Sequence, residues 1–305
     1  NPRVVTQLQL EEKIAADDAD LRTAESVVMI QCVGCRNADR NYCSRICCST
    51  SIKHALRLKV LNPEMDVTIL FRDMRTYGFR EDFYRKAADK GVRFIRYTTE
   101  RMPAVESSGT GGESTLRIRV ADPILDRVLG IDTDWLVLAS AIVPRSDARE
   151  VAQLFKATLG ADGFFQEAHA KLRPVDCGAE GVFLCGTAHY PKLIAETISQ
   201  AYGAAGRALT LLANDTVAAS GSVCEVDEDR CLGCKICVSA CAFGAITIKK
   251  TRQGQKAMVN PVLCKGDGLC NARCPTGAIQ LKHYTDDALL NQIRAALRPE
   301  IVVNQ

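Results

Sequence analysis

The sequence lacks the features that mark membrane, exported or nucleic-acid-binding proteins. No run of about 18 apolar residues occurs, so no transmembrane helix is predicted. Residues 1–20 are polar and acidic, which is unlike a signal peptide. The net charge of +3 is too small to favour nucleic acid or an anionic membrane as a partner. These absences predict a globular protein of the cytoplasm.

Histidine is scarce and cysteine is abundant, which limits the kinds of metal or disulfide site that the chain can form. Only four histidines occur, none in a zinc-like spacing, against fifteen cysteines. A disulfide scaffold suits short exported chains, and an odd cysteine count fits it poorly. Disulfides and structural zinc are therefore weaker interpretations than iron–sulfur clusters in a reducing cytoplasm. The chain begins at Asn1 rather than Met, so we expect a processed or partial product, or one half of a longer design.

A cysteine repeat near the C-terminus has the spacing of a ferredoxin. Residues 231–241 read CLGCKICVSAC, the C-x2-C-x2-C-x3-C pattern in which the fourth cysteine ligates the other cluster. Residues 264–275 read CKGDGLCNARCP, a second copy. The segments 242–248 and 275–281 extend the repeat and are expected to be paired short strands. Crosswise ligation predicts one cluster on Cys231, Cys234, Cys237 and Cys274, and a second on Cys241, Cys264 and Cys270.

The second copy of this repeat has Asp267 where its second cysteine would be. A carboxylate is a harder donor than a thiolate, so iron bound there should be more labile. This predicts either a [4Fe–4S] cluster with Asp267 as its fourth ligand or a [3Fe–4S] cluster; alternatively, Asp267 is a solvated loop residue. Cys224 lies outside both motifs and is expected to be a buried small apolar residue. The segment 223–284 resembles a bacterial 2[4Fe–4S] ferredoxin domain.

An apolar run at residues 26–31, SVVMIQ, opens a βαβ unit. A helix-like stretch at 44–62 and a strand at 66–73 follow it. A dinucleotide-binding fold should carry G-x-G-x-x-G after the first strand. Here the loop reads QCVGCRNADRNYC, in which only Gly34 remains. The phosphate cradle is therefore lost, and cysteines stand in its place.

The cysteines of this loop are predicted to hold another cluster. Cys43 and Cys47 are four residues apart, which puts them on one face of the expected helix start. A helix N-terminus favours the negative charge of a thiolate-bound cluster. We therefore predict a [4Fe–4S] cluster on which Cys32, Cys43, Cys47 and Cys48 converge. Spacing alone leaves Cys35 as a competitor for Cys32, and a redox dithiol or vicinal disulfide at Cys47–Cys48 is the alternative.

The later segments continue the α/β pattern. Residues 75–97 predict a helix ending at Gly91 and then a strand, and residues 115–147 predict strands with a hairpin-like excursion. Residues 181–213 predict an apolar strand, a glycine-containing loop and a long helix. In flavoproteins with two dinucleotide-binding domains, such a segment holds the flavin; the alternative is a buried strand packed on a helix. The flavin-binding candidates here are Gly186, Thr187, Ala188 and Lys192.

Taken together, these segments resemble the A-type subunit of heterodisulfide reductase and its homologues in anaerobes. The resemblance covers residues 1–284 in segment order and is carried by MIQCVGCR (29–36), YCSRICC (42–48), SIKHAL (51–56), RTYGFREDFYRKA (75–87), GVFLCGTAHYPK (181–192) and the ferredoxin repeat. It implies an α/β fold: a thioredoxin-reductase-like, Rossmann-type domain with a degenerate nucleotide site, followed by an α+β ferredoxin domain. It favours Cys32 over Cys35, because relatives commonly carry Ser at the latter position. It also implies that Lys53 lies near the flavin; a solvated helix lysine is the alternative.

The resemblance further implies an electron-transfer component of a flavin-based, electron-bifurcating complex with about three clusters per chain. Family members carry a preceding part with the glycine-rich FAD loop, so the FAD site of this chain would be completed by residues outside it. The implied partners are B- and C-type subunits, a hydrogenase, formate dehydrogenase or NADH module, and ferredoxin. Two other functions compete: a pyridine-nucleotide-dependent flavin oxidoreductase with a ferredoxin tail, which needs the absent glycine-rich loop, and a non-catalytic cluster-bearing scaffold. The resemblance leaves the terminal electron acceptor open.

The expected domain organisation follows from these segments. We expect a connector at 1–22, the cluster-bearing Rossmann-like domain at 23–147, the C-terminal part of the FAD-binding domain at 148–218, the ferredoxin domain at 219–285 and a tail at 286–305.

Overall fold

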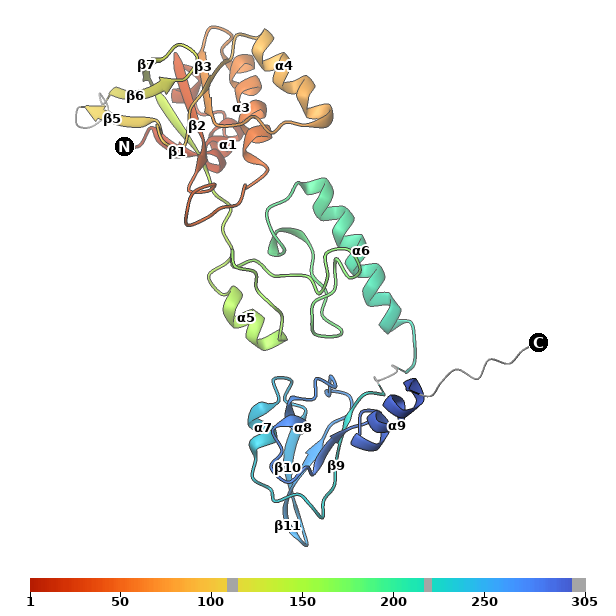
Figure 1. Ribbon diagram of the computed structural model, residues 1–305. Coiled ribbons are helices and arrows are strands. Elements are labelled where there is room, and N and C mark those ends of the chain that lie inside the picture. Colours follow the sequence, from red (N-terminus) through yellow and green to blue (C-terminus); the bar gives the residue numbers. More distant parts are fainter. Residues whose placement is uncertain (109–114, 217–220, 298–305) are drawn as a thin grey trace. The chain divides into compact units, whose positions relative to one another are not determined.

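The chain folds into two units, residues 1–210 and residues 211–305 (Figure 1). The computed structural model describes residues 1–108, 115–216 and 221–297. No helix within these ranges has the length and hydropathy that crossing a membrane requires.

A parallel sheet of five strands, in the order β1–β8–β2–β3–β4, forms the centre of the first unit. Its strands are Val4–Thr6 (β1), Trp135–Ser140 (β8), Ser26–Val33 (β2), Asp66–Phe71 (β3) and Arg93–Arg96 (β4). Strand β2 pairs with β8 on one side and β3 on the other, and its six inner residues are buried. An apolar run without alternation is typical of such a strand, because both faces of the sheet are covered. Helix α3, Cys47–Leu61, joins β2 to β3, so the predicted βαβ unit is confirmed.

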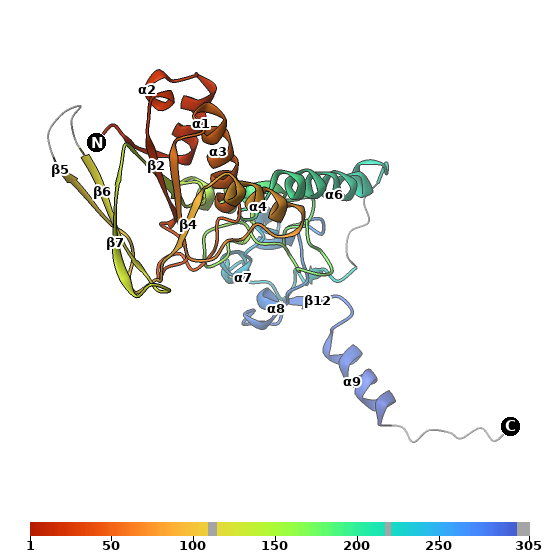
Figure 2. The same cartoon turned by 90° about the horizontal axis from the view of Figure 1, so that it is seen from above.

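Different layers cover the two faces of this sheet (Figure 2). Helices pack on one face, where Leu58 meets Met29 in the core. An antiparallel three-stranded sheet packs on the other face, through Ile118 against Val28. Full burial of each such aliphatic side chain contributes about 1.5–3 kcal/mol. The helices are Gln7–Ala15 (α1), α3 and Glu81–Asp89 (α4); the strands are Ala104–Ser108 (β5), Thr115–Asp122 (β6) and Arg127–Thr133 (β7).

Residues 1–22 are part of this sheet-and-helix body rather than the connector that the sequence predicts. Strand β1 pairs in parallel with β8, and Leu10 of α1 is fully buried. Leu21, in the short helix Ala19–Arg22 (α2), is fully buried as well. The polar composition of this segment belongs to its outer face, which hid the amphipathic pattern.

The remainder of the first unit contains little regular structure before its long last helix, Ile194–Leu212 (α6). It contains the helix Ala148–Phe155 (α5) and the turn Gly186–Ala188 (η3). The strand expected around 181–185 is wrong, since Phe183 makes an isolated bridge to Asp176 instead. Its backbone exchanges two hydrogen bonds with residues 175–177, from Cys177 N to Val182 O and from Leu184 N to Val175 O, and this short pairing is not extended into any sheet of the described residues.

The second unit has the two-fold repeated architecture of a ferredoxin, as predicted. The segments expected to pair with each other instead pair with two further strands, in the antiparallel pairs β10–β11 and β12–β9. A buried layer that includes Ile246, Ala257 and Ile279 holds the two pairs together. The elements are Cys224–Val226 (β9), Ile236–Ala240 (α7), Ile246–Thr251 (β10), Gly254–Val259 (β11), Leu269–Ala272 (α8), Ile279–Leu281 (β12) and Asp286–Ala296 (α9). Of the expected tail, residues 298–305 lie outside the described part of the chain.

Candidate functional site

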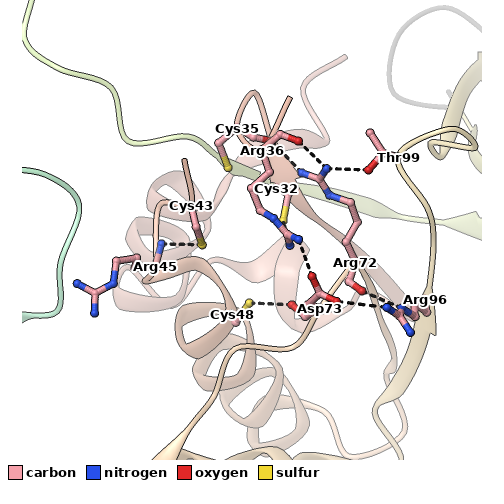
Figure 3. Close-up of polar contacts among 10 residues, drawn as sticks. All are labelled: Cys32, Cys35, Arg36, Cys43, Arg45, Cys48, Arg72, Asp73, Arg96 and Thr99. Carbon is pink, nitrogen blue, oxygen red and sulfur yellow. Dashed lines mark hydrogen bonds and ion pairs between the residues drawn. The ribbon is translucent and has the colours of Figure 1, made fainter. Parts of the chain in front are cut away.

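Five cysteines lie around the end of strand β2 and the start of helix α3, and Figure 3 draws four of them, Cys32, Cys35, Cys43 and Cys48. Cys32 lies at the end of β2 and has a positive φ of 60°. Helix α3 begins at Cys47, so Cys47 and Cys48 occupy its first turn. Cys43 therefore lies in the preceding loop, and the prediction that it shares a helix face with Cys47 is wrong. Arg45 has a φ of 64°, which a right-handed helix does not allow, so helix α3 cannot extend back to include Cys43.

Arginines line the side of this cysteine group that faces strand β3. Arg36 Nη1 lies 3.8 Å from Cys32 Sγ, and the same guanidinium pairs with Asp73. Arg72 is buried and donates to the carbonyl oxygens of Cys35 at 2.8 Å and Arg36 at 2.7 Å. These bonds fix the loop backbone and place positive charge beside the sulfurs (Figure 3).

The thiols of this group differ in acidity for physical reasons that the structure makes plain. The hydrogen bond between Cys35 and Cys32 lowers the pKa of Cys32, and the charges of Arg72 and Arg36 act in the same direction. Burial raises the pKa of Cys47 to about 12, and the neighbouring sulfurs of Cys48, Cys43 and Cys32 add to the rise. Buried thiols of this kind lose their protons when a metal supplies the compensating charge.

The electrostatic coupling distinguishes Cys35 from the other four sulfurs. Cys47 and Cys48 both respond to charge on Cys32 and Cys43, whereas Cys35 is tied to Cys32 and to Ser44. Within residues 1–108, 115–216 and 221–297, no three His, Cys, Asp or Glu side chains could hold a single metal ion. A cubane distributes its ligands over four irons, so its ligands, unlike those of a zinc ion, need not meet at one point.

The candidate flavin residues lie on the turn that precedes helix α6. Gly186 has a φ of 69°, and its N–H donates to Gln200 Oε1 at 2.9 Å. Lys192 is buried, which lowers the pKa of its ammonium, and its Nζ contacts Gln200 Oε1 and lies 3.2 Å from His189 Nδ1. The turn Gly186–Ala188 therefore lies beside a buried cation, and both the Gly186 N–H and the Lys192 ammonium donate to Gln200.

The structure links this turn to the cysteine loop but not to Lys53. Arg45 of the loop pairs with Glu196 of α6 at 2.7 Å, and both line one pocket with Lys192. Lys53 instead pairs with Glu11 and lines a separate groove between α3 and α4. The expected place of Lys53 beside the flavin candidates is therefore not what the structure shows.

In the second unit, four cysteines from both copies of the repeat line one pocket. They are the set predicted to hold the first cluster: Cys231, Cys234, Cys237 and Cys274. The N–H of Ala257 donates to Cys231 Sγ at 3.4 Å, and that of Ala278 donates to Cys274 Sγ at 3.2 Å. Backbone donors to sulfur stabilise thiolate charge, and they are among the features that set cluster potentials.

The second set of cysteines is arranged around a residue that the motif does not include. Cys270 and Cys264 lie close together, and the Cys224 thiol is 3.4 Å from Cys270 Sγ. Cys241 packs against the same buried group. Asp267 is exposed, and its Oδ1 accepts a hydrogen bond from Leu269 N at 3.3 Å.

Sequence reasoning missed three residues with polar roles at these sites. Arg36 is part of the cysteine loop and contacts Cys32, whereas Arg72 contacts the loop from the end of strand β3, a position that no motif marks. The sequence predicts a core position for Cys224; it is buried, but among cysteines. An odd cysteine shortly before a ferredoxin motif was the available signal.

Comparisons with known proteins agree with this arrangement. A family model described as a 4Fe-4S dicluster domain matches residues 230–278. The iron-sulfur A subunit of CoB–CoM heterodisulfide reductase from Methanocaldococcus jannaschii is 37% identical over 309 residues, covering 96% of this chain and 46% of that protein. The A subunit of H2:CoB-CoM heterodisulfide,ferredoxin reductase from Methanothermobacter marburgensis is also 37% identical, covering 96% of this chain and 45% of that protein. The chain thus spans less than half the length of these relatives.

Among solved structures, the thioredoxin reductase of T. acidophilum aligns with a TM-score of 0.45 at 14% identity. The alignment covers 70% of this chain and 58% of that one.

Proposed function

Because this chain is a homologue of the heterodisulfide reductase A-type subunit over most of its length, we propose that it transfers electrons between a flavin and iron–sulfur clusters. The proposal assigns three clusters: one in the cysteine loop of the first unit and two in the ferredoxin unit. A bound [4Fe–4S] cluster would carry single electrons, and a flavin would exchange either single electrons or pairs.

The observation that carries this proposal is the pocket lined by four cysteines of the ferredoxin unit. Cys231, Cys234 and Cys237 come from one copy of the repeat and Cys274 from the other. Such crosswise convergence is what two-cluster ferredoxins require. Backbone N–H groups donate to two of these sulfurs, which supports the assignment of a thiolate-ligated cluster to this pocket.

In the first unit, the proposed ligands are Cys32, Cys43, Cys47 and Cys48. Arg36 and the N-terminal turn of α3 would hold the negative charge of the thiolates. Arg72 positions the loop through the carbonyls of Cys35 and Arg36. Cys35 would remain a thiol that donates to Cys32 and so lowers its basicity.

The turn Gly186–Ala188 and Lys192 are the proposed contacts to FAD. A buried ammonium such as that of Lys192 favours the anionic forms of a reduced flavin. The Arg45–Glu196 pair would keep this turn at a fixed place relative to the cysteine loop. The remainder of the FAD site would come from outside these 305 residues.

We also propose that the chain works with other subunits in an electron-bifurcating assembly. The printed names of relatives refer to hydrogen, formate, ferredoxin and the CoB–CoM heterodisulfide. Corresponding partners for this chain would be heterodisulfide-reductase-type subunits, a hydrogenase or formate dehydrogenase module, and ferredoxin. Pull-down of the native protein followed by mass spectrometry would identify them.

Anaerobic reconstitution of the chain with iron and sulfide tests the cluster assignment. We expect about three clusters per chain that change oxidation state in a potentiometric titration. Cys47→Ser should remove about a third of the iron and sulfide, since it loses one of three clusters. Cys35→Ser is the matched control and should keep all of them. Stoichiometric zinc without sulfide would refute the proposal, and clusters that do not cycle would favour a structural scaffold.

A further inference from the structure

The two halves of the ferredoxin unit correspond residue by residue at an offset of 33. Gly233 and Gly266 both have positive φ, and a Cβ on either would lie 2.3 Å from a carbonyl oxygen, that of Gln255 or Ser222 respectively. Two residues further on, the Ala257 N–H donates to Cys231 Sγ and the Cys224 N–H donates to Cys264 Sγ, both at 3.4 Å. Strand β9 therefore repeats the role of β11, and Cys224 is the counterpart of Ala257.

This correspondence fixes where the Cys224 side chain points. Ala257 lines the first cluster pocket together with its four cysteines. By the same geometry, Cys224 faces the second set, and its sulfur lies 3.4 Å from Cys270 Sγ. Two sulfurs that bind different irons of one cubane lie further apart than this contact, so the Cys224 side chain must rotate away from Cys270 to bind the fourth iron. It is only 4% exposed, so its thiol has no access to solvent as an alternative partner.

The motif position in this second half is occupied by a poorer donor. Asp267 corresponds to Cys234 at the same offset. Both positions are exposed, so exposure does not discriminate between them. Two other facts do: the Asp267 carboxylate already accepts a hydrogen bond from Leu269 N at the start of α8, and iron in sulfide clusters prefers thiolate to carboxylate.

We propose that Cys224, rather than Asp267, is the fourth ligand of the second cluster, together with Cys241, Cys264 and Cys270. A cysteine missing from the ligand loop is thus replaced by one on the adjacent strand. The inference rests on the proposed function, since it assumes that this unit binds clusters. On ligation an iron–sulfur bond forms and the S–H bond breaks; the proton leaves while the cluster is being inserted, before the site closes over the Cys224 sulfur. The second cluster then has four thiolates and keeps its fourth iron.

The test compares variants of the full chain after anaerobic reconstitution. Cys224→Ala should convert the second cluster to [3Fe–4S], which gives an EPR signal in the oxidised protein, whereas an intact [4Fe–4S] cluster is silent in that state. Asp267→Ala should leave the oxidised protein silent. Cys177→Ala, which removes a buried cysteine of the first unit, is the matched control and should also stay silent.

A rescue experiment separates ligation from misfolding. Under this assignment, adding Asp267→Cys to Cys224→Ala restores a thiolate at the motif position and should abolish the [3Fe–4S] signal. A signal that appears in Asp267→Ala but not in Cys224→Ala would overturn the assignment, as would a [3Fe–4S] signal in the unmodified chain. If the unmodified chain assembles no cluster, the proposed function fails, and this inference fails with it.

Discussion

Replacing Arg36 by Gln should lower the reduction potential of the cluster proposed in the cysteine loop. Arg36 Nη1 lies 3.8 Å from Cys32 Sγ, and its side chain is 20% exposed. A cluster that accepts an electron becomes more negative, so a nearby cation stabilises the reduced form. Removing that cation therefore makes reduction less favourable.

The magnitude follows from the distance and from the partner of Arg36. Two unit charges 3.8 Å apart interact by about 4 kcal/mol at an effective dielectric constant of roughly 20. Asp73 pairs with the same guanidinium and offsets part of this, and the added electron is spread over the whole cluster. A net effect of about 1–2 kcal/mol corresponds to roughly 40–90 mV for one electron.

A potentiometric titration followed by EPR measures this shift in the reconstituted chain. The two clusters of the ferredoxin unit serve as internal standards, because their potentials should not change. Arg93→Gln is the matched control, since Arg93 pairs with Asp66 at the opposite end of strand β3. An unchanged or higher potential in Arg36→Gln would show that this arginine does not face the cluster.

Two further predictions concern the folded scaffold. Gly233→Ala should lose the first ferredoxin cluster, and with it about a third of the iron. Gly233 has a φ of 66°, and a Cβ there would lie 2.3 Å from the carbonyl oxygen of Gln255. Gly206→Ala in α6 is the control: its Cβ would meet no atom within 4 Å, so this variant should retain all the iron. Asp176→Asn should lower the unfolding free energy at neutral pH but not at low pH, as measured by urea unfolding between pH 3 and 7. Arg207 and Arg173 hold the pKa of Asp176 below its ordinary value, so its contribution is present above about pH 4 and is lost as the pH falls through the folded pKa. An acid limb with the same slope in both proteins would contradict this.

The βαβ unit and the ferredoxin repeat were predictable because their signals are local. A buried parallel strand is a continuous apolar run, and residues 26–31 have that pattern. The ligand spacing in 231–241 reflects one tight loop and one helical turn, which need no information from elsewhere in the chain. The loss of the glycine-rich loop could also be recognised from the sequence, because that motif is one short continuous stretch.

Predictions failed where an element depends on distant neighbours. Phe183 belongs to an apolar run like that of β2, yet it forms a single bridge to Asp176 and joins no sheet in the described part of the chain. Val4–Thr6 is short and flanked by polar residues, yet it becomes β1 because the edge of β8 is open to it. Lys53 follows the cysteine pair by about one turn, but Glu11 of another helix draws it toward a different groove.

The sequence by itself predicts the kind of cofactor. The cysteine spacing in residues 231–241, repeated in residues 264–275, is that of ligands to iron–sulfur clusters. Folding decided which sulfurs meet and which charges surround them. Cys224 reaches Cys270 only because β9 pairs with β12, and Arg72 reaches the cysteine loop only because β2 and β3 lie side by side. Spacing along the backbone is set by covalent geometry, whereas these encounters are set by burial and hydrogen bonding between segments far apart in the sequence.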